Sequence, residues 1–415
     1  MGAATSEKVS TYIHEDIAFS ILSKLPLKSF KRFECVRKSW SLLFQNHGFM
    51  NMFRTNFLSN LHSCSYYDQA SLLLKLAGEH QELLYSLSGE RFENKVKLDR
   101  LNPFTNNAYF PIFGFGSVNG MFCLHECCSD DKHVLWNPAT NEFNVIPRSP
   151  VEFIESTIPE IAKDLVSVGV VSYLQGFGYD SVTDDYKLIR YVCFVGDIHD
   201  AQLADVLEEF VLRDVSLDSV WEVYSLRSNS WRKLDVDMPY SLECKEGTQV
   251  YMDGVCHWLC EDDYESSEKH NSPSGPCLVS FYLNNEVFFV TPIPSDLDDC
   301  FDIEALWINL AVLNGSIALI SYHEEMSTFH ISILGELAVK ESWTKLFIVR
   351  PLPCVERPIG VGTKGEIFFI RKDAEIVWLD LSTQMIEVLG YKGGGLTTRM
   401  VIYKGNILQI AGISN

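Results

Sequence analysis

The sequence predicts an α+β fold, in which an N-terminal module of three helices precedes a mostly antiparallel β domain, most simply a β-propeller with irregular blades. Two observations carry this prediction. Apolar residues recur at helical spacing up to about residue 58. From about residue 65 the helical period disappears, and short apolar runs alternate with turn residues. A β-sandwich is the alternative, because the same density of short strands permits it.

Composition and charge indicate a globular protein whose two parts carry opposite net charge. The chain has 415 residues, of which 47% are hydrophobic and 21% charged, as in ordinary globular proteins. Its net charge of −21 argues against nucleic-acid binding, which needs a surplus of basic side chains. Residues 1–54 nevertheless carry a net positive charge. We therefore predict a disordered segment at 1–10, a basic helical module at 11–55 and an acidic β domain at 65–413.

The first helix is predicted over residues 13–25. Its apolar residues recur at every fourth position with one flanking leucine, which makes a single stripe: Ile13, Ile17, Ile21, Leu22 and Leu25. Pro26 ends the helix, because proline has no amide donor and its ring clashes with the preceding turn.

Two further helical patterns follow. The second has an apolar stripe at Phe30, Phe33, Val36 and Trp40, and the third continues over 49–58. Some 45 residues cannot bury so many large apolar side chains internally. Part of this surface must be covered either by the chain's own β domain or by a partner, and the pattern alone leaves both open.

The residues of this module resemble the plant F-box. The resemblance rests on Ile-His-Glu-Asp-Ile at 13–17, Ile-Leu-Ser-Lys-Leu-Pro-Leu-Lys-Ser at 21–29 and Arg-Phe-Glu-Cys-Val-Arg-Lys-Ser-Trp at 32–40. One departure is His14, where the family has a proline. The resemblance implies binding to a Skp-type adaptor and, through it, to a cullin and a RING protein. It assigns the contact to Ile17, Ile21, Leu22, Leu25, Pro26, Val36 and Trp40. Trp40 is expected to be the main anchor of this interface.

Two phrases repeat along the β domain. The first is a hairpin signal in which glycine follows a polar residue between two apolar runs, at Gly120, Gly254, Gly315, Gly365 and Gly405. The second is strand, polar turn, strand, as at 134–143, 221–231, 280–288 and 377–386, with a related variant at 178–187. The later spacings of the first phrase approach the 40–50 residues of a four-stranded propeller blade. The long interval from Gly120 to Gly254 is expected to hold two or three such units with insertions.

The β domain is similar to the plant F-box-associated interaction domain. The similarity rests on the segments at 134–147, 176–180, 224–231 and 254–259. It extends to the pollen S-locus F-box proteins, whose targets are basic ribonucleases, and to F-box–kelch proteins, without singling out either. It implies a non-catalytic substrate receptor of a cytoplasmic or nuclear ubiquitin ligase, with no cofactor and an unknown protein target.

Other motifs favour structural roles. The clusters Cys123–Cys128 and Cys256–Cys260 lie in strand-like runs whose side chains alternate between faces, so we predict core thiols and no zinc site. The GxGxxG pattern at 360–365 precedes a strand where a dinucleotide site needs a helix, so we predict a turn. Acidic clusters at 197–218, 261–268 and 296–304 are solvated insertions or a surface selecting a basic target. The alternative function is a propeller enzyme or small-molecule binder that uses a central channel.

Overall fold

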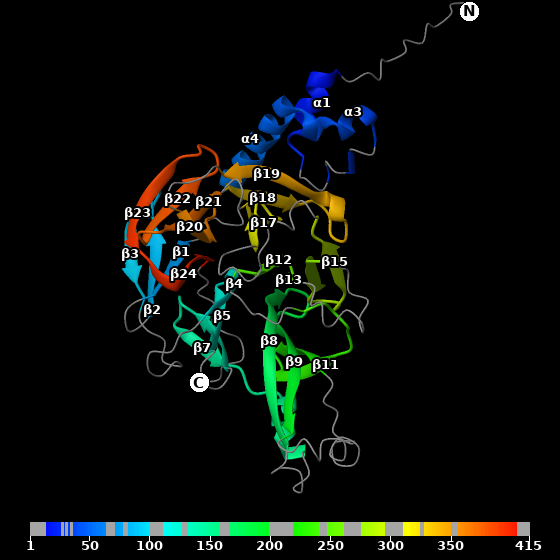
Figure 1. Cartoon of the computed structure of the whole chain (residues 1–415), viewed down its shortest axis with the longest axis vertical. Coiled ribbons are helices and arrows are strands. Elements are labelled where there is room, and N and C mark those ends of the chain that lie inside the picture. The colour runs from blue at the N-terminus through cyan, green and yellow to red at the C-terminus, as the bar shows by residue number, and fades with distance from the viewer. Residues whose placement is uncertain are drawn as a thin grey trace, which may run out of the picture.

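The computed structural model (Figure 1) describes most of the chain. The described residues are 14–25, 29, 32–33, 36–63, 71–77, 82–98, 111–126, 132–157, 166–198, 219–240, 247–260, 275–294, 310–323, 328–349 and 355–404. The predicted N-terminal segment 1–10, Pro26, Gly405, Cys127–Cys128 and nearly all of the three acidic clusters lie outside them. None of the described helices is long and apolar enough to cross a membrane.

Helices occupy the N-terminal part, as predicted, but their limits differ. Helix α1 spans Glu15–Leu22 and ends earlier than predicted, because the chain turns at Ser23. The predicted second helix is described as α3, Lys38–Ser41, followed by the short 3₁₀ turn η1, Leu43–Gln45. Helix α4 spans His47–Ser63 and passes the predicted boundary at residue 55. Asn46 caps α4, since its Oδ1 accepts a hydrogen bond from the Phe49 N–H at 3.0 Å.

The described strands of the β domain form six four-stranded antiparallel units. The first contains β1 (Ser71–Ala77), β2 (Glu82–Ser88), β3 (Asn94–Lys97) and the C-terminal strand β24 (Gly394–Tyr403), and the second contains β4 (Ile112–Val118), β5 (Met121–Glu126), β6 (Lys132–Asn137) and β7 (Glu142–Val145). The third contains β8 (Val166–Asp180), β9 (Asp185–Ile198), β10 (Val220–Ser225) and β11 (Ser230–Leu234), preceded by the 3₁₀ segment η3 (Pro150–Thr157). The fourth contains β12 (Gln249–Met252), β13 (Val255–Cys260), β14 (Cys277–Tyr282) and β15 (Phe288–Pro292).

The last two units complete the domain. The fifth contains β16 (Leu310–Leu313), β17 (Ser316–His323), β18 (Thr328–Leu334) and β19 (Trp343–Val349), with the 3₁₀ turn η5 (Lys340–Ser342) before β19. The sixth contains β20 (Val355–Val361), β21 (Glu366–Arg371), β22 (Glu375–Asp380) and β23 (Ile386–Lys392). One parallel bridge between β24 and β4 joins the first two units into an eight-stranded sheet. A β-sandwich would have two packed sheets, whereas the described strands form five.

The repeated phrases occupy equivalent places in these units. Asn119–Gly120, Asp253–Gly254 and Asn314–Gly315 each join the first and second strands of a unit, and both residues of each pair have positive φ. These are the tight hairpins that the dipeptides predict. The polar turns of the second phrase join the third and fourth strands. The GxGxxG segment at 360–365 lies at the hairpin between β20 and β21, as predicted.

One strand of each unit meets the neighbouring units: β24 contacts β4 and β20, and β12 contacts β4, β8 and β16. The two ends of the domain close against each other, because C-terminal β24 pairs with β1 from Ser71↔Tyr403 onward. Close approach of β24 requires glycine on its neighbours. A Cβ at Gly116 would lie 2.7 Å from the Ile402 carbonyl oxygen, and one at Gly360 would lie 2.2 Å from that of Met400.

Candidate docking surface

Helix α1 has two apolar faces with different fates. Ala18 and Leu22, one turn apart, are buried, and Leu22 keeps only 3% of its surface exposed. Ile17 and Ile21, each one position before a buried residue and on the neighbouring face of the helix, are 56% and 54% exposed. The helix therefore uses one face to fold and leaves large apolar side chains on the other.

Contacts with α4 fix the orientation of α1. The rings of Phe19 and Phe49 meet edge to face with their centroids 5.8 Å apart. At the end of α1, the Asn56 side-chain amide donates to the Ser23 carbonyl at 3.2 Å and to the Ser23 hydroxyl at 2.9 Å. These contacts determine which face of α1 turns inward.

The segment after α1 exposes further apolar side chains. Val36 is 67% exposed, and Phe33 and Leu42 are also exposed. The Phe33 ring packs edge to face on Trp40 with centroids 6.1 Å apart, and Trp40 is half-buried. We call the exposed apolar side chains of this module the docking residues: Ile17, Ile21, Phe33, Val36 and Leu42. Three basic side chains of the same module, Lys24, Arg37 and Lys38, are also exposed.

The seven residues predicted to contact an adaptor do not share one environment. Ile17, Ile21 and Val36 are exposed, whereas Leu22 belongs to the largest apolar core of the molecule. Leu25 and Trp40 are half-buried and pack against that core. Leu22 is thus a packing residue in this structure, and it presents almost no surface to a partner.

The helical module is mounted on the fifth unit of the β domain. The rings of Phe57 on α4 and Phe347 on β19 pack with their centroids 6.2 Å apart. The Arg54 guanidinium donates to the Leu346 carbonyl, and burial lowers the pKa of Arg54. Asn314 donates to the Phe57 carbonyl at 3.4 Å. The chain's own β domain therefore covers α4, which is one of the two predicted alternatives, while the docking residues stay exposed.

An ion pair supplements this mount. Arg32 Nη2 lies 2.8 Å from Glu336 Oε1, which belongs to the loop between β18 and β19. Both side chains are partly or largely exposed, so the pair adds little to stability. Sequence reasoning missed Arg54, Asn314 and Glu336 altogether, because they lie about 260 to 300 positions from their partners.

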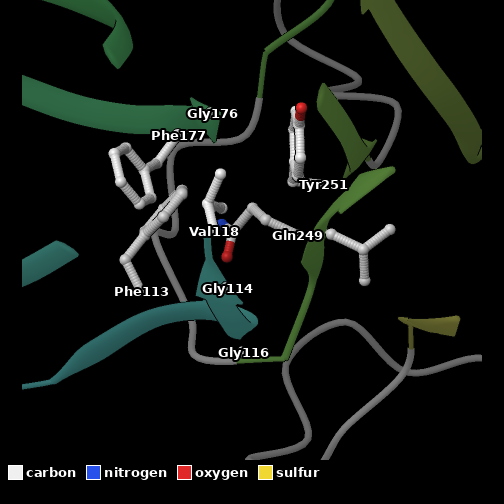
Figure 2. Close-up of a pocket in the computed structure, with 9 residues that line it drawn as sticks. Phe113, Gly114, Gly116, Val118, Gly176, Phe177, Gln249 and Tyr251 are labelled. Carbon is white, nitrogen blue, oxygen red and sulfur yellow. The ribbon is translucent and has the colours of Figure 1, made fainter. Parts of the chain in front are cut away.

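A small central pocket bears on the predicted alternative of a propeller enzyme. It lies between β4, β8 and β12, and its lining includes Phe113, Phe177, Gln249 and Tyr251 (Figure 2). Its cavity volume of about 10 Å³ is the space of a single water molecule. The Tyr251 hydroxyl is already engaged, donating to the Tyr179 carbonyl at 2.8 Å and accepting from the Gly254 N–H at 3.1 Å. This pocket offers neither room for a substrate nor an available proton-transfer group.

The cysteine clusters have the environment of core residues. Cys123 on β5 and Cys256 and Cys260 on β13 are buried, and burial raises the pKa of each thiol. His257 between the last two is buried as well, and burial lowers its pKa to about 3. In the part of the chain that the structure describes, no three histidine, cysteine or acidic residues gather as a metal site.

Comparison with known proteins gives a consistent result. The family model described as the F-box associated beta propeller domain matches residues 82–400. The F-box protein At4g22390 of Arabidopsis thaliana is 26% identical over 81% of this chain and 79% of its own length. The F-box protein CPR1 of the same plant is 24% identical over 91% of this chain and 84% of its own length.

Likeness to solved structures is weaker. An oligogalacturonate lyase from Vibrio parahaemolyticus has a TM-score of 0.39 and 11% identity, covering 77% of this chain and 74% of that chain. A likeness at this level says nothing about activity.

Proposed function

Because this chain belongs to the F-box associated β-propeller family, we propose that it is the substrate-recognition subunit of an SCF-type ubiquitin ligase. The helical module docks a Skp-type adaptor, and through it a cullin and a RING protein. The β domain holds the target protein. The observation that carries this proposal is the exposure of the docking residues, above all Ile17, Ile21 and Val36, on a module whose other faces pack against the core.

The physical argument starts from the cost of that exposure. Full burial of a fully exposed isoleucine or valine gains about 1.5–3 kcal/mol. Ile17, Ile21 and Val36 are 56%, 54% and 67% exposed, so each would gain roughly half of that. A folded module has no reason of its own to leave three such side chains in water beside a well-packed core. A partner with an apolar groove recovers this free energy. The exposed Lys24, Arg37 and Lys38 favour a partner whose groove has an acidic rim.

The β domain fits the receptor role as a β-propeller of six blades, which is the second part of the proposal. Pairing of β24 with β1 supports it, since it joins the two ends of the domain within one blade. Such a body holds a target at a fixed place relative to the adaptor. Ubiquitin transfer then gains from proximity, and the chemistry belongs to partner enzymes. The similarity to the S-locus and kelch types of F-box protein stays a prediction.

The test is binding of the full chain to a purified Skp-type adaptor, measured by calorimetry. The double variant Ile17→Asp/Ile21→Asp should bind at least about tenfold more weakly, since buried charges oppose docking. Asn51→Asp/Thr55→Asp is the matched control, because it adds the same two charges at exposed sites on α4. Unchanged affinity of the double variant, with its fold intact by circular dichroism, contradicts the proposal.

A further inference from the structure

The third unit contains a strand pair that is longer than its sheet. Strands β8 and β9 pair along their whole length, from Val166↔Ile198 to Asp180↔Asp185. The next strand, β10, pairs with β9 only between Lys187 and Val192. Beyond Val192, the described residues give β9 no strand partner other than β8. The two strands continue as a ribbon beyond the rest of the sheet.

This ribbon stands apart from the helical module. It runs away from the other units at the end of the molecule opposite α1 (Figure 1). Isolated two-stranded ribbons are marginally stable in water. An extension of this kind is therefore expected to gain stability from a further strand on its open edge.

The backbone groups that face the open edge can be assigned from one hydrogen bond. The Leu226 N–H donates to the Tyr186 carbonyl at 3.0 Å, so Tyr186 points its backbone groups toward β10. Alternate residues of a strand point the same way. Strand β9 keeps one register with β10 from Lys187 to Val192 and one with β8 from Val192 to Ile198, because the extra residue at the β8–β9 register shift lies in β8, between Leu174 and Gly176. Phe194 and Gly196 consequently direct their N–H and C=O groups outward, past the end of β10.

The first four residues of the open edge, Cys193–Gly196, lack the features by which proteins block strand addition, and Asp197 and Ile198 complete the strand. Edge strands are commonly protected by charged residues or proline. The outermost strands of all six units carry such residues: Lys95 and Lys97 on β3, Glu142 on β7, Arg232 and Lys233 on β11, Pro292 on β15, Lys345 on β19, Glu387 and Lys392 on β23. The edge segment Cys193–Gly196 carries neither a charge nor a proline.

Charge decides between possible occupants of this edge. A second copy of the chain would bring two bodies of net charge −21 together. Asp197, which follows the edge segment, adds a local negative charge. A basic partner is attracted where a second copy is repelled. We propose that the β9 edge at Cys193–Gly196 accepts an extended segment of a basic protein as an added strand.

This surface deepens the proposed function, because it rests on that function for identifying the basic protein as the ubiquitination target. The added strand would bond its backbone to Phe194 and Gly196, so affinity would depend on main-chain groups. Specificity would come from alternate side chains of the partner segment, which lie against the two faces of the ribbon.

The test uses the complex of the full chain with its adaptor, and a phage-displayed library of random 12-residue peptides as the probe. Enriched peptides are synthesised and their affinities measured by fluorescence anisotropy. We expect basic peptides with alternating apolar residues. Gly196→Pro, which removes an outward N–H, should weaken binding at least tenfold. Gly196→Ala keeps that N–H and should bind like the wild type. Equal affinity for the wild type and Gly196→Pro, or no enriched peptide, overturns the proposal.

Amide hydrogen exchange on the wild-type protein covers the case in which Gly196→Pro disturbs the ribbon itself. The Phe194 and Gly196 amides should exchange fast in the free complex and slowly with peptide bound. Slow exchange before peptide is added means that the chain itself or a second copy already covers the edge, and also overturns the proposal. Adaptor binding, measured in parallel, should be the same for all three proteins. If the wild-type protein does not bind the adaptor, the proposed function is contradicted. The peptide measurements on the full chain then still test the β9 edge by themselves.

Discussion

The rings of Phe57 and Phe347 pack against each other with their centroids 6.2 Å apart, across 290 residues of sequence. This contact joins the last turns of the helical module to the outer strand of the fifth unit. It is flanked by the hydrogen bonds of Arg54 to Leu346 and of Asn314 to Phe57. The helical module is thus held at a fixed orientation relative to the β domain, which is the geometry that the proposed receptor role requires.

A double-mutant cycle measures the coupling free energy between Phe57 and Phe347. Phe57→Ala and Phe347→Ala should each lower the free energy of unfolding by about 3–5 kcal/mol, because both remove buried rings. Together they should cost about 0.5–1.5 kcal/mol less than the sum, the coupling of one aromatic pair. Urea unfolding checks the values. Phe57→Ala combined with Phe122→Ala, in the distant second unit, should be additive, and an equal coupling there would contradict the assignment.

The two faces of α1 should respond differently to truncation. Leu22→Ala should lower the free energy of unfolding by about 2–5 kcal/mol, since it leaves a cavity in the core. Ile17→Ala should change it by about 0.5 kcal/mol or less, because the side chain is largely exposed. Adaptor affinity should follow the opposite order. A larger loss of stability for Ile17→Ala than for Leu22→Ala would mean that the faces are assigned the wrong way round.

His257 should make stability depend on pH. Burial lowers its pKa from 6.5 to about 3, and its Nδ1 lies 2.8 Å from the Ser280 hydroxyl. Between these values the unfolded chain binds a proton that the folded chain does not, so stability falls as pH decreases. The slope reaches at most about 1.4 kcal/mol per pH unit. Urea unfolding at pH 6.5 and 5.5 should show His257→Asn losing less stability than the wild type, and equal losses would contradict the buried neutral imidazole.

A buried ion pair should be costly to break on one side. Arg190 Nη2 lies 2.8 Å from Glu222 Oε2 and 2.6 Å from Glu152 Oε1, and both Arg190 and Glu222 are buried. Glu222→Ala should lower the free energy of unfolding by about 3–5 kcal/mol, because it leaves a buried charge poorly paired. Arg190→Met/Glu222→Leu should cost less than Glu222→Ala, since the two fully buried charges are removed together and the Glu152 carboxylate that remains is partly exposed. Thermal and urea unfolding of both variants provide the comparison.

The local sequence pattern was sufficient to predict several hairpins of the β domain. Asn119–Gly120, Asp253–Gly254 and Asn314–Gly315 predicted three hairpins that the structure contains, because positive φ is a property of the residues themselves. The turn at 360–365 was also predictable, because a strand pattern follows it in the sequence. The long interval between Gly120 and Gly254 holds two periods, in which the hairpin at 181–184 replaces the glycine signal.

The assignment of faces was not predictable. The sequence shows one broad apolar stripe on the first helix, and nothing in its spacing separates Leu22, which is buried, from Ile21, which is exposed. The difference arises from contacts with α4, where Phe49 meets Phe19 and Asn56 holds Ser23. Likewise, the open edge of β9 is evident only from the structure, in which the pairing of β10 with β9 stops at Val192.

The amino-acid sequence by itself determined the division into a basic helical module and an acidic β domain, together with the hairpins, since these depend on composition, periodicity and the φ preferences of single residues. Only the tertiary structure decided which apolar side chains remain in water, where the module is attached and how β24 closes on β1. Those outcomes depend on residues that lie from 33 positions apart, as for Ser23 and Asn56, to 332 positions apart, as for Ser71 and Tyr403. A local pattern carries no information about which distant surface will cover it.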